Sequence, residues 1–253
     1  MNLGLAGRAI ALAGSTSGIG SALATSLDRE HARLLLVGGR PERLDALAHT
    51  LSPSALIDIV PGDLRREADR NRCTVALLRS EELDGFVFLP AELRTDTFSE
   101  ARTREFRETF DVNVFAAFEF AQAALSRASS SASFVFISSI DAHRHPRHTP
   151  SASYDSSKRM LESISESVAV EAGSRGIRSN CVIPGLIRTP MTEDFFGQEF
   201  ERERLRFLEA VPLGRVGNPE DVANLITFLL SPVAGYINGA SIPVDGGFLC
   251  QGL

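Results

Sequence analysis

The sequence predicts an α/β fold in which one parallel sheet carries helices on both faces. Short apolar runs alternate along the chain with longer segments of helical periodicity, and this alternation is typical of βαβ units. The apolar runs also lack a strict polar–apolar alternation, which indicates strands that are buried on both faces. A glycine-rich turn follows the first of these runs directly. We therefore expect residues 1–253 to form a single doubly wound domain with a sheet of about seven strands.

Seven apolar runs, rich in Val, Ile, Leu and Phe, are the predicted strands. In chain order they are Arg8–Ala13, Leu34–Val37, Leu56–Val60, Gly85–Leu89, Ser133–Ile137, Arg178–Ile183 and Ser241–Val244. Helical spacing of apolar residues recurs between them, as in Ile19, Leu23 and Leu27 and, over a longer span, in Phe106, Phe110, Val114 and Phe118. The serine-rich stretch Ser126–Ser133 is too short to separate domains and is expected to be a helix-to-strand turn.

Composition and charge exclude several classes of protein. The formal net charge of -6 argues against a general nucleic-acid binder. No apolar run approaches the roughly 20 residues that span a bilayer, and the stretch Ala9–Ala13 is too short for a secretory signal. Cys73, Cys181 and Cys250 are odd in number and far apart, which fits free thiols in a reducing compartment. We expect a cytoplasmic protein with no membrane or nucleic-acid partner.

The turn after the first strand has the sequence Gly14-Ser15-Thr16-Ser17-Gly18-Ile19-Gly20. Glycines let the backbone approach a ligand closely, and a following helix offers its amide donors and dipole to a phosphate. The spacing differs from the common G-x-G-x-x-G of dinucleotide sites, and the lysine of a nucleoside triphosphate-hydrolysing loop is missing. A purely structural turn is the alternative interpretation.

The end of the second strand bears on the choice of cofactor. In nucleotide-binding folds of this type, an acidic residue about 20 positions after the glycines holds the ribose 2′-hydroxyl of NAD. Gly39 and then Arg40 occupy this place, so a cation is present where NADP carries its 2′-phosphate. NADP is therefore favoured and NAD is the alternative, unless Arg40 only begins a solvated loop with Arg43. Asp63 follows the third strand, where its carboxylate could accept from an adenine amino group or cap the next helix.

Tyr154 and Lys158 form the strongest chemical signal in the chain. Lys158 is the only lysine among 26 basic residues, and Tyr154 is one of two tyrosines. Positions i and i+4 of a helix share one face, so the ammonium can reach the phenol or a ligand bound beside it. A nearby positive charge lowers a tyrosine pKa from about 10, which makes the phenol a proton donor near neutral pH. A surface pair without chemistry is the alternative.

Taken in chain order, these segments resemble the short-chain dehydrogenase/reductase family over essentially the whole length. The residues that carry the resemblance are the glycine turn, Asn113 in Phe110-Asp111-Val112-Asn113-Val114, Ser138-Ser139 after a hydrophobic strand, Tyr154-x-x-x-Lys158, Pro184-Gly185-Leu186-Ile187-Arg188-Thr189-Pro190-Met191 and Val244-Asp245-Gly246-Gly247. The resemblance implies a Rossmann-type domain that transfers a hydride between nicotinamide and a ketone or secondary alcohol.

The resemblance also implies roles for individual residues. Tyr154 is expected to be the acid/base, Ser139 to bind the substrate oxygen, and Lys158 to lower the tyrosine pKa and bind the nicotinamide ribose. Asn113 is expected to help hold a water that continues the proton relay from Lys158. Cofactor contacts are expected at Gly14, Ser15, Ser17, Gly18, Ile19, Gly20, Arg40, Asp63, Leu64, Tyr154, Lys158, Pro184, Gly185, Ile187 and Thr189. A core polar group (Asn113) and a turn cap (Ser139) are the structural alternatives, and no metal is expected.

The chain departs from the family pattern in three places. The family usually has Asn-Asn-Ala-Gly after the fourth strand, whereas this chain has Phe88-Leu89-Pro90-Ala91. Asparagine amides are lost there and a methyl group faces the cofactor, so we expect an effect on cofactor affinity. Ala13 stands where the family often has threonine. Ser139 and Tyr154 are 15 positions apart, a slightly longer interval than is usual.

Two further segments bear on the substrate. Residues 141–148 contain three histidines and two arginines, namely His143, Arg144, His145, Arg147 and His148. They could form a metal site, a basic patch for a carboxylate, phosphate or carrier-bound group, or a solvated loop. Residues 189–211 contain three aromatic rings, Phe195, Phe196 and Phe200. These could pack on the core or form a lid over an apolar substrate, and the family precedent favours the lid.

The predicted function is that of an NADP-dependent ketoreductase, resembling 3-oxoacyl reductases or tailoring a natural product. Its substrate would be a small carbonyl or alcohol compound, with an anionic or carrier-bound compound as one alternative. A dinucleotide-binding sensor or scaffold of the same fold is the alternative function, motivated by the changed stretch Phe88–Ala91. In the family, the helices around Asn113 and after Tyr154 form subunit interfaces, and both carry apolar residues here, so we expect a homo-oligomer, either a dimer or a tetramer.

Overall fold

A computed structural model describes residues 2–145 and 150–251 of the chain. The centre of this described part is one seven-stranded sheet with the order β3-β2-β1-β4-β5-β6-β7, and all neighbouring strands run parallel. In chain order the strands are β1 Ala9–Ala13, β2 Arg33–Gly38, β3 Leu56–Pro61, β4 Leu83–Phe88, β5 Ala128–Ile137, β6 Arg178–Pro184 and β7 Ser241–Val244. The predicted fold class and strands are confirmed. Only the serine-rich turn was wrong, because β5 begins within it.

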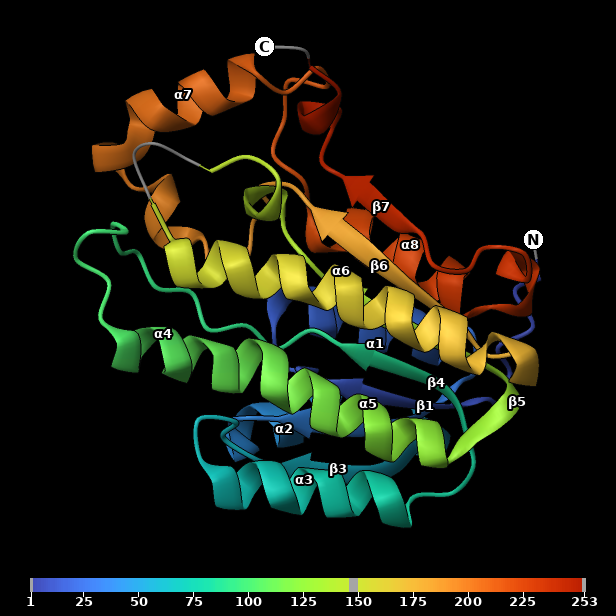
Figure 1. Ribbon diagram of the computed structural model, residues 1–253. Coiled ribbons are helices and arrows are strands. Elements are labelled where there is room, and N and C mark those ends of the chain that lie inside the picture. The colour runs from blue at the N-terminus through green and yellow to red at the C-terminus, as the bar shows by residue number, and fades with distance from the viewer. Residues whose placement is uncertain (1, 146–149, 252–253) are drawn as a thin grey trace.

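Helices cover both faces of the sheet (Figure 1). In chain order the α-helices are α1 Gly18–Arg29, α2 Pro41–Ala48, α3 Glu67–Arg79, α4 Thr103–Phe110, α5 Ala116–Ser126, α6 Ala152–Ala172, α7 Glu201–Glu209 and α8 Pro219–Leu230. Side chains of β1 alternate between two buried clusters. Ile10 and Leu12 pack with α1, α2 and α8, whereas Ala9, Ala11 and Ala13 pack with α3, α5 and α6. This alternation explains why the strands read as continuous apolar runs.

The long amphipathic segment from Phe106 to Phe118 is not one regular helix. A turn of π-helix, Asp111–Phe115, separates α4 from α5 and places Asn113 in its middle. Such turns insert an extra residue into the helical ladder and are frequent at functional sites.

The order in which strands are added to the sheet changes side between β1 and β4: β2 and β3 lie on one side of β1, and β4 to β7 lie on the other. Ala13, the last residue of β1, pairs with Val37 on one side and with Phe88 on the other. The loops after β1 and β4 therefore meet, and a side chain on Gly14 would come within 3.0 Å of the Pro90 nitrogen. Ligands of doubly wound sheets bind at such a switch point. In Figure 1, α7 lies beyond the carboxyl ends of β6 and β7, on this side of the molecule. Among the described residues, no helix is long and apolar enough to cross a membrane.

Candidate active site

The glycine turn after β1 is shaped to hold an anion against the start of α1. Gly14 has a φ of +79°, a left-handed conformation that favours glycine. The Ser17 hydroxyl caps α1 by accepting from the Gly20 amide at 3.0 Å. The amides of Gly18 and Ile19 find no acceptor in the described part of the chain, so they are free at the positive end of the helix dipole. This cradle fits the pyrophosphate of a dinucleotide.

Two of the predicted cofactor residues turn their side chains into the protein. Ser15 is fully buried, and its hydroxyl donates to the Val37 carbonyl at 3.1 Å. Leu64 is 8% exposed and belongs to the core cluster under α3 and α5. Any cofactor contact of these two residues must therefore come from the backbone, which the sequence alone did not indicate.

Arg40 and Asp63, which were predicted to contact the adenosine part of the cofactor, differ in exposure and in partners. Arg40 is exposed at the end of β2, where it precedes the first turn of α2. Asp63 instead forms a two-pronged pair with Arg65, with 2.9 Å from each carboxylate oxygen to a guanidinium nitrogen. The hydrogen bond from Arg65 holds the Asp63 pKa below its usual value. Helix α3 begins later and takes Arg66 as its N-cap, so the alternative of Asp63 as a helix cap was wrong.

Three consecutive residues at the end of β5 contact α6. The Lys158 Nζ atom donates to the Ile137 carbonyl at 2.9 Å. The Ser138 hydroxyl proton is shared between the Lys158 carbonyl at 3.0 Å and a Glu162 carboxylate oxygen at 2.8 Å. The Ser139 hydroxyl lies beside the Tyr154 phenol, close enough to influence its pKa. The Lys158 Nζ atom lies 5.6 Å from the centre of the phenol ring, and both side chains are buried. The structure thus brings Ser139, Tyr154 and Lys158 together.

The protonation of this group differs from the sequence expectation. Burial of the phenol, followed by the negative charge of Asp141, raises the pKa of Tyr154 well above its usual value, and the nearby Ser139 hydroxyl only partly opposes this. Burial also lowers the pKa of Lys158 to about 8. The prediction that Lys158 lowers the phenol pKa is therefore wrong for the protein by itself. The physical reason is that desolvation of a fully enclosed phenol outweighs an ammonium whose hydrogen bond goes to Ile137.

Two carboxylates beside the phenol were not predicted from the sequence. Burial and the nearby Asp155 raise the pKa of Asp141 to about 6. Burial also raises the pKa of Asp155, although a 2.7 Å contact with the His145 ring opposes the shift. The available signal was their position, since Asp155 directly follows Tyr154 and Asp141 lies two residues after Ser139.

Asn113 is fully buried and ties the loop after β4 to α6. Its side-chain oxygen accepts from the Glu92 amide at 2.7 Å, and its side-chain nitrogen donates to the Glu92 carbonyl at 3.1 Å and to the Ser157 hydroxyl at 2.9 Å. The side chain therefore has the structural role that we considered as an alternative. Its part in a proton relay stays a prediction.

Apolar packing replaces the asparagine amides that the family has after β4. The Phe88 ring is buried and meets Phe120 edge-on, with 6.1 Å between the ring centres. The Leu89 amide donates to the Ala13 carbonyl at 3.1 Å, which joins the ends of β4 and β1. Together with the two hydrogen bonds between Asn113 and Glu92, this packing holds the loop after β4 in place without the family's asparagine amides.

The basic groups after Ser139 are engaged within the protein. His143 contacts the Glu162 carboxylate at 2.9 Å, and His145 contacts Asp155 as described above. Arg144 lies over the Phe248 ring at 5.8 Å and donates to the Gln251 carbonyl. Among the described residues, His143, Arg144 and His145 are thus paired with other groups of the protein and form neither a shared metal site nor an open basic patch. Arg147 and His148 lie outside the described residues.

The segment after β6 carries the aromatic rings of the expected lid. Phe195 and Phe200 lie 5.7 Å apart between ring centres, and the Arg188 guanidinium stacks on Phe196 at 4.7 Å. Arg204 of α7 donates to the Phe195 carbonyl at 3.1 Å, so it fixes this turn to the helix. The three rings are only partly buried, which favours the lid over ordinary core packing.

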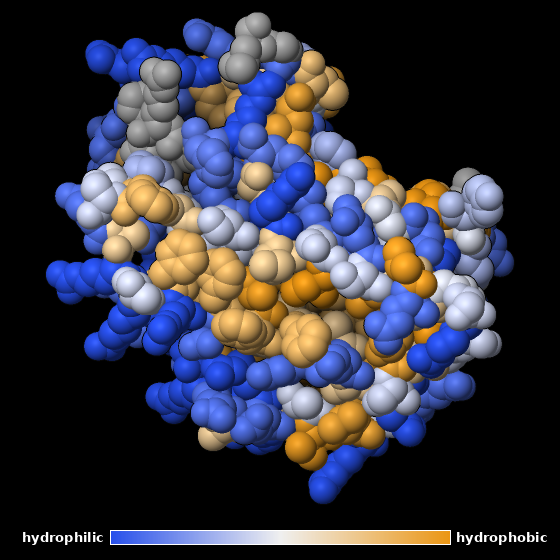
Figure 2. Space-filling view, viewed as in Figure 1, coloured by the Kyte–Doolittle hydropathy of each residue, from blue (hydrophilic) through white to orange (hydrophobic). Residues whose placement is uncertain are grey.

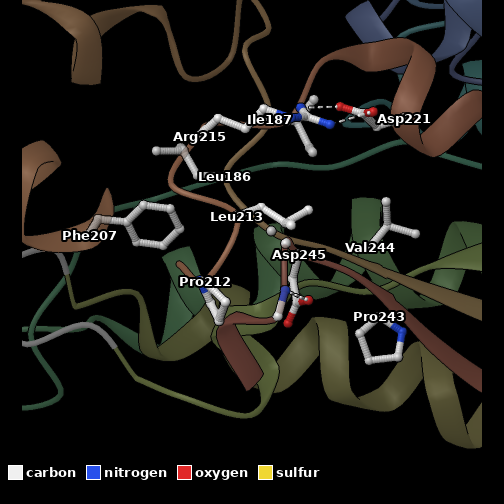
Figure 3. Close-up of a pocket in the computed structure, with 14 residues that line it drawn as sticks. Leu186, Ile187, Phe207, Pro212, Leu213, Arg215, Asp221, Pro243, Val244 and Asp245 are labelled. Carbon is white, nitrogen blue, oxygen red and sulfur yellow. Dashed lines mark hydrogen bonds and ion pairs between the residues drawn. The ribbon is translucent and has the colours of Figure 1, made fainter. Parts of the chain in front are cut away.

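The β6 end lies between the glycine turn and a cavity. A side chain at Gly18 would come within 2.8 Å of the Thr189 methyl group, so the two loops nearly touch. On the other side lies a cavity of about 530 Å³, and Figure 3 draws the residues that line it. Its walls include Leu186 and Ile187 from the β6 loop, with Phe207 at one end. The predicted contacts Pro184, Gly185, Ile187 and Thr189 are thus placed along one loop, with Ile187 almost fully buried.

An arginine–carboxylate pair closes the far end of this cavity. Arg215 bonds both carboxylate oxygens of Asp221, at 2.7 and 3.0 Å (Figure 3). Because this cation is already paired, the cavity presents mainly apolar walls.

Comparisons with known proteins agree on one group of enzymes. A family model described as enoyl-(acyl carrier protein) reductase matches residues 13–249. The 3-oxoacyl-(acyl-carrier-protein) reductase FabG of Rickettsia felis is 30% identical over 249 residues, which cover 97% of this chain and 98% of the relative. A tropinone reductase homolog of Arabidopsis thaliana is 31% identical over 98% of this chain and 94% of its own. The structure of a short-chain dehydrogenase/reductase (glucose/ribitol dehydrogenase) from Brucella melitensis has a TM-score of 0.88 and 28% identity, and the match covers 98% of this chain and 99% of that chain.

Proposed function

The chain belongs to the short-chain dehydrogenase/reductase family, and we propose that it reduces a ketone to a secondary alcohol with NADPH. Membership makes it an oxidoreductase that acts on CH–OH or C=O groups with a nicotinamide dinucleotide. The observation that carries the finer proposal is the buried trio of Ser139, Tyr154 and Lys158, joined across the ends of β5 and α6.

The protonation of the trio favours the direction of reduction. A phenol with a raised pKa stays protonated through the neutral range, so Tyr154 is ready to give its proton to a carbonyl oxygen. The Ser139 hydroxyl donates to the same oxygen and orients it. The Lys158 ammonium, with a pKa of about 8, can return a proton to the phenol after each turnover. When bound, the dihydronicotinamide supplies the hydride.

The surroundings of the glycine turn support NADP over NAD. The turn offers free amides to a pyrophosphate, as described above. Beyond it, Arg40 presents an exposed guanidinium at the end of β2, with Arg43 one helical turn further. Arginine binds phosphate oxygens through paired hydrogen bonds, so this corner would attract a 2′-phosphate. NAD is the second choice.

The lid and the relatives support a proposal for the substrate class. The relatives quoted above include a 3-oxoacyl reductase and a tropinone reductase homolog by name. The partly buried rings of the lid and the apolar cavity beside it suit a ketone with an apolar portion. We infer a 3-oxoacyl thioester or a natural-product ketone. A free anionic substrate is less well supported, because His143, Arg144 and His145 are engaged with other groups of the protein.

The same chain would work as a homo-oligomer in the cytoplasm. Figure 2 shows an apolar area over α4, α5 and α6. Phe115, Phe118 and Met160 are each about half exposed, at 51%, 49% and 44%. We infer that a second copy covers this face in a dimer or tetramer. Light scattering of the purified protein tests this, and Phe115→Glu should give a smaller particle.

A sensor or scaffold is a weaker candidate for the function. Its motivation was the changed stretch Phe88–Ala91, which the fold accommodates by packing while the trio stays intact. Two measurements separate the candidates. Loss of NADPH absorbance with a panel of 3-oxoacyl thioesters and cyclic ketones should occur with the wild type and stop in Tyr154→Phe. NADPH binding without turnover of any compound would instead favour the sensor.

A further inference from the structure

Glu162 is a buried carboxylate that the proposed chemistry does not use. It lies on α6 one turn after Lys158 and is 5% exposed. One of its oxygens accepts from the Ser138 hydroxyl at 2.8 Å and contacts the His143 ring at 2.9 Å. The other oxygen lies 3.0 Å from the Arg159 guanidinium. A carboxylate is unfavourable in such a place unless several partners compensate it, and here three do so.

Two of these partners stand on either side of Ser139. Ser138 comes directly before it, and His143 comes four residues after it. Between them the chain makes a single turn, Ile140–Ala142, in which the Asp141 amide donates to the Ser139 hydroxyl at 3.2 Å. One carboxylate therefore holds both ends of the short segment that carries Ser139.

The helix positions the carboxylate on the same face as the reactive groups. Tyr154, Lys158 and Glu162 are spaced by four residues, so their side chains lie along one side of α6. Lys158 and Glu162 hydrogen-bond the chain at the end of β5, Lys158 to Ile137 and Glu162 to Ser138, and Tyr154 faces Ser139. The placement of Ser139 against Tyr154 thus depends on the Glu162 bond as well as on the Lys158 bond.

We propose that Glu162 is a positioning residue that keeps Ser139 in place against Tyr154 by holding Ser138 and His143. This role rests on the proposed reductase function, since it acts through the groups that bind the carbonyl oxygen. It predicts a defect in the chemical step with an intact cofactor site, because the hydrogen bonds of Glu162 within the described residues go to Ser138, His143 and Arg159 and none goes to the glycine turn or the β6 loop.

Single-turnover reduction at saturating NADPH tests the proposal, with NADPH affinity measured separately by fluorescence. Glu162→Leu removes both acceptors and should lower the rate about 10- to 100-fold, as small displacements of reacting groups do. Glu162→Gln keeps an acceptor oxygen for Ser138 and His143 and should restore most of the rate. Glu166→Leu, on the same helix but exposed, is the matched control and should behave as the wild type. NADPH affinity should stay unchanged in all three.

A double variant shows whether Glu162 acts through Ser138. Ser138→Ala should lower the rate by itself, because it removes the bonds to Glu162 and to the Lys158 carbonyl. Its effect should be smaller in Glu162→Leu than in the wild type, because the bond to Glu162 is already absent there. Losses that multiply would overturn the proposal. So would a wild-type rate in Glu162→Leu, or a loss in Glu162→Gln as large as in Glu162→Leu. Should Glu162→Leu fail to fold, Ser138→Ala and Glu162→Gln still decide the question.

Hydrogen exchange separates this inference from the proposed function. The amides of Ala142, His143 and Arg144 bond back to Ser139 and Ile140, so they report on the segment directly. They should exchange faster in Glu162→Leu than in the wild type or Glu166→Leu, whether or not a substrate is known. A wild type that reduces no carbonyl compound would refute the function alone, whereas unchanged exchange would refute the positioning role.

Discussion

Replacing Lys158 by methionine should stabilise the protein while it stops catalysis. Burial lowers the pKa of this lysine from 10.5 to about 8, so keeping the ammonium charged disfavours the folded state at neutral pH. One pKa unit corresponds to about 1.4 kcal/mol, which gives about 3 kcal/mol for the whole shift. Methionine also forfeits the bond to the Ile137 carbonyl, worth about 1 kcal/mol. The net gain is about 2 kcal/mol, or roughly 5 °C in Tm for a chain of this size.

The pH dependence of this gain has a definite sign. Since the folded pKa lies below the unfolded one, the unfolded chain binds more protons between pH 8 and 10.5, and the wild type gains stability as pH rises through that window. By about pH 9.5 the wild type should have recovered about 2 kcal/mol, so the advantage of the methionine variant should have vanished. Other groups that titrate there are common to both proteins and cancel in the difference.

Urea unfolding of the wild type and Lys158→Met at about pH 7 and about pH 9.5 measures both terms. Lys158→Arg is the control with the opposite sign, because guanidinium cannot lose its charge in the site and should destabilise the fold. Turnover should fall by about 100-fold or more in Lys158→Met. A methionine variant that is less stable than the wild type at neutral pH, or a difference that ignores pH, would refute the reasoning.

Three further predictions concern the same site. Tyr154→Phe should abolish turnover and leave NADPH binding intact. Because the chain has no tryptophan, the difference in absorbance near 295 nm between the wild type and this variant reports Tyr154, and it should show no ionisation below about pH 11. An ionisation in this difference below that pH would contradict the raised phenol pKa. Asp141→Asn removes a negative charge that raises this pKa, so the ionisation of Tyr154 followed near 295 nm should move to lower pH, and an unmoved ionisation would argue against the coupling. Arg40→Asp should weaken NADPH binding by about 10-fold or more and affect NADH less, as measured by fluorescence titration. Equal losses for both cofactors would remove the basis for an NADP preference.

The sequence predicted the fold well because the relevant information is local. Strands buried on both faces must be continuously apolar, and the turn at Gly14 must be glycine-rich, so both are visible without a structure. The relation between Tyr154 and Lys158 was equally accessible, since helical spacing alone puts them on one face.

What escaped prediction depends on contacts between distant segments. Nothing near Ser15 or Leu64 indicates that their side chains turn into the core. The pKa of Tyr154 is set by how completely the fold encloses it, and the partners of Glu162 come from a loop 19 and 24 residues away. Residue spacing along one helix cannot report such enclosure, which arises only when the sheet and helices pack.

The lid helix and the loop after Ser139 are joined through the end of the chain. Phe207 of α7 stacks on Phe248 with 5.0 Å between ring centres. The Arg144 guanidinium also lies over the Phe248 ring, 5.8 Å from its centre. Substitutions at Phe248 would therefore change how α7 and the loop after Ser139 pack together, while leaving the proton-transfer groups untouched. For anyone wishing to broaden the range of accepted ketones, this single aromatic side chain is the natural first place to intervene.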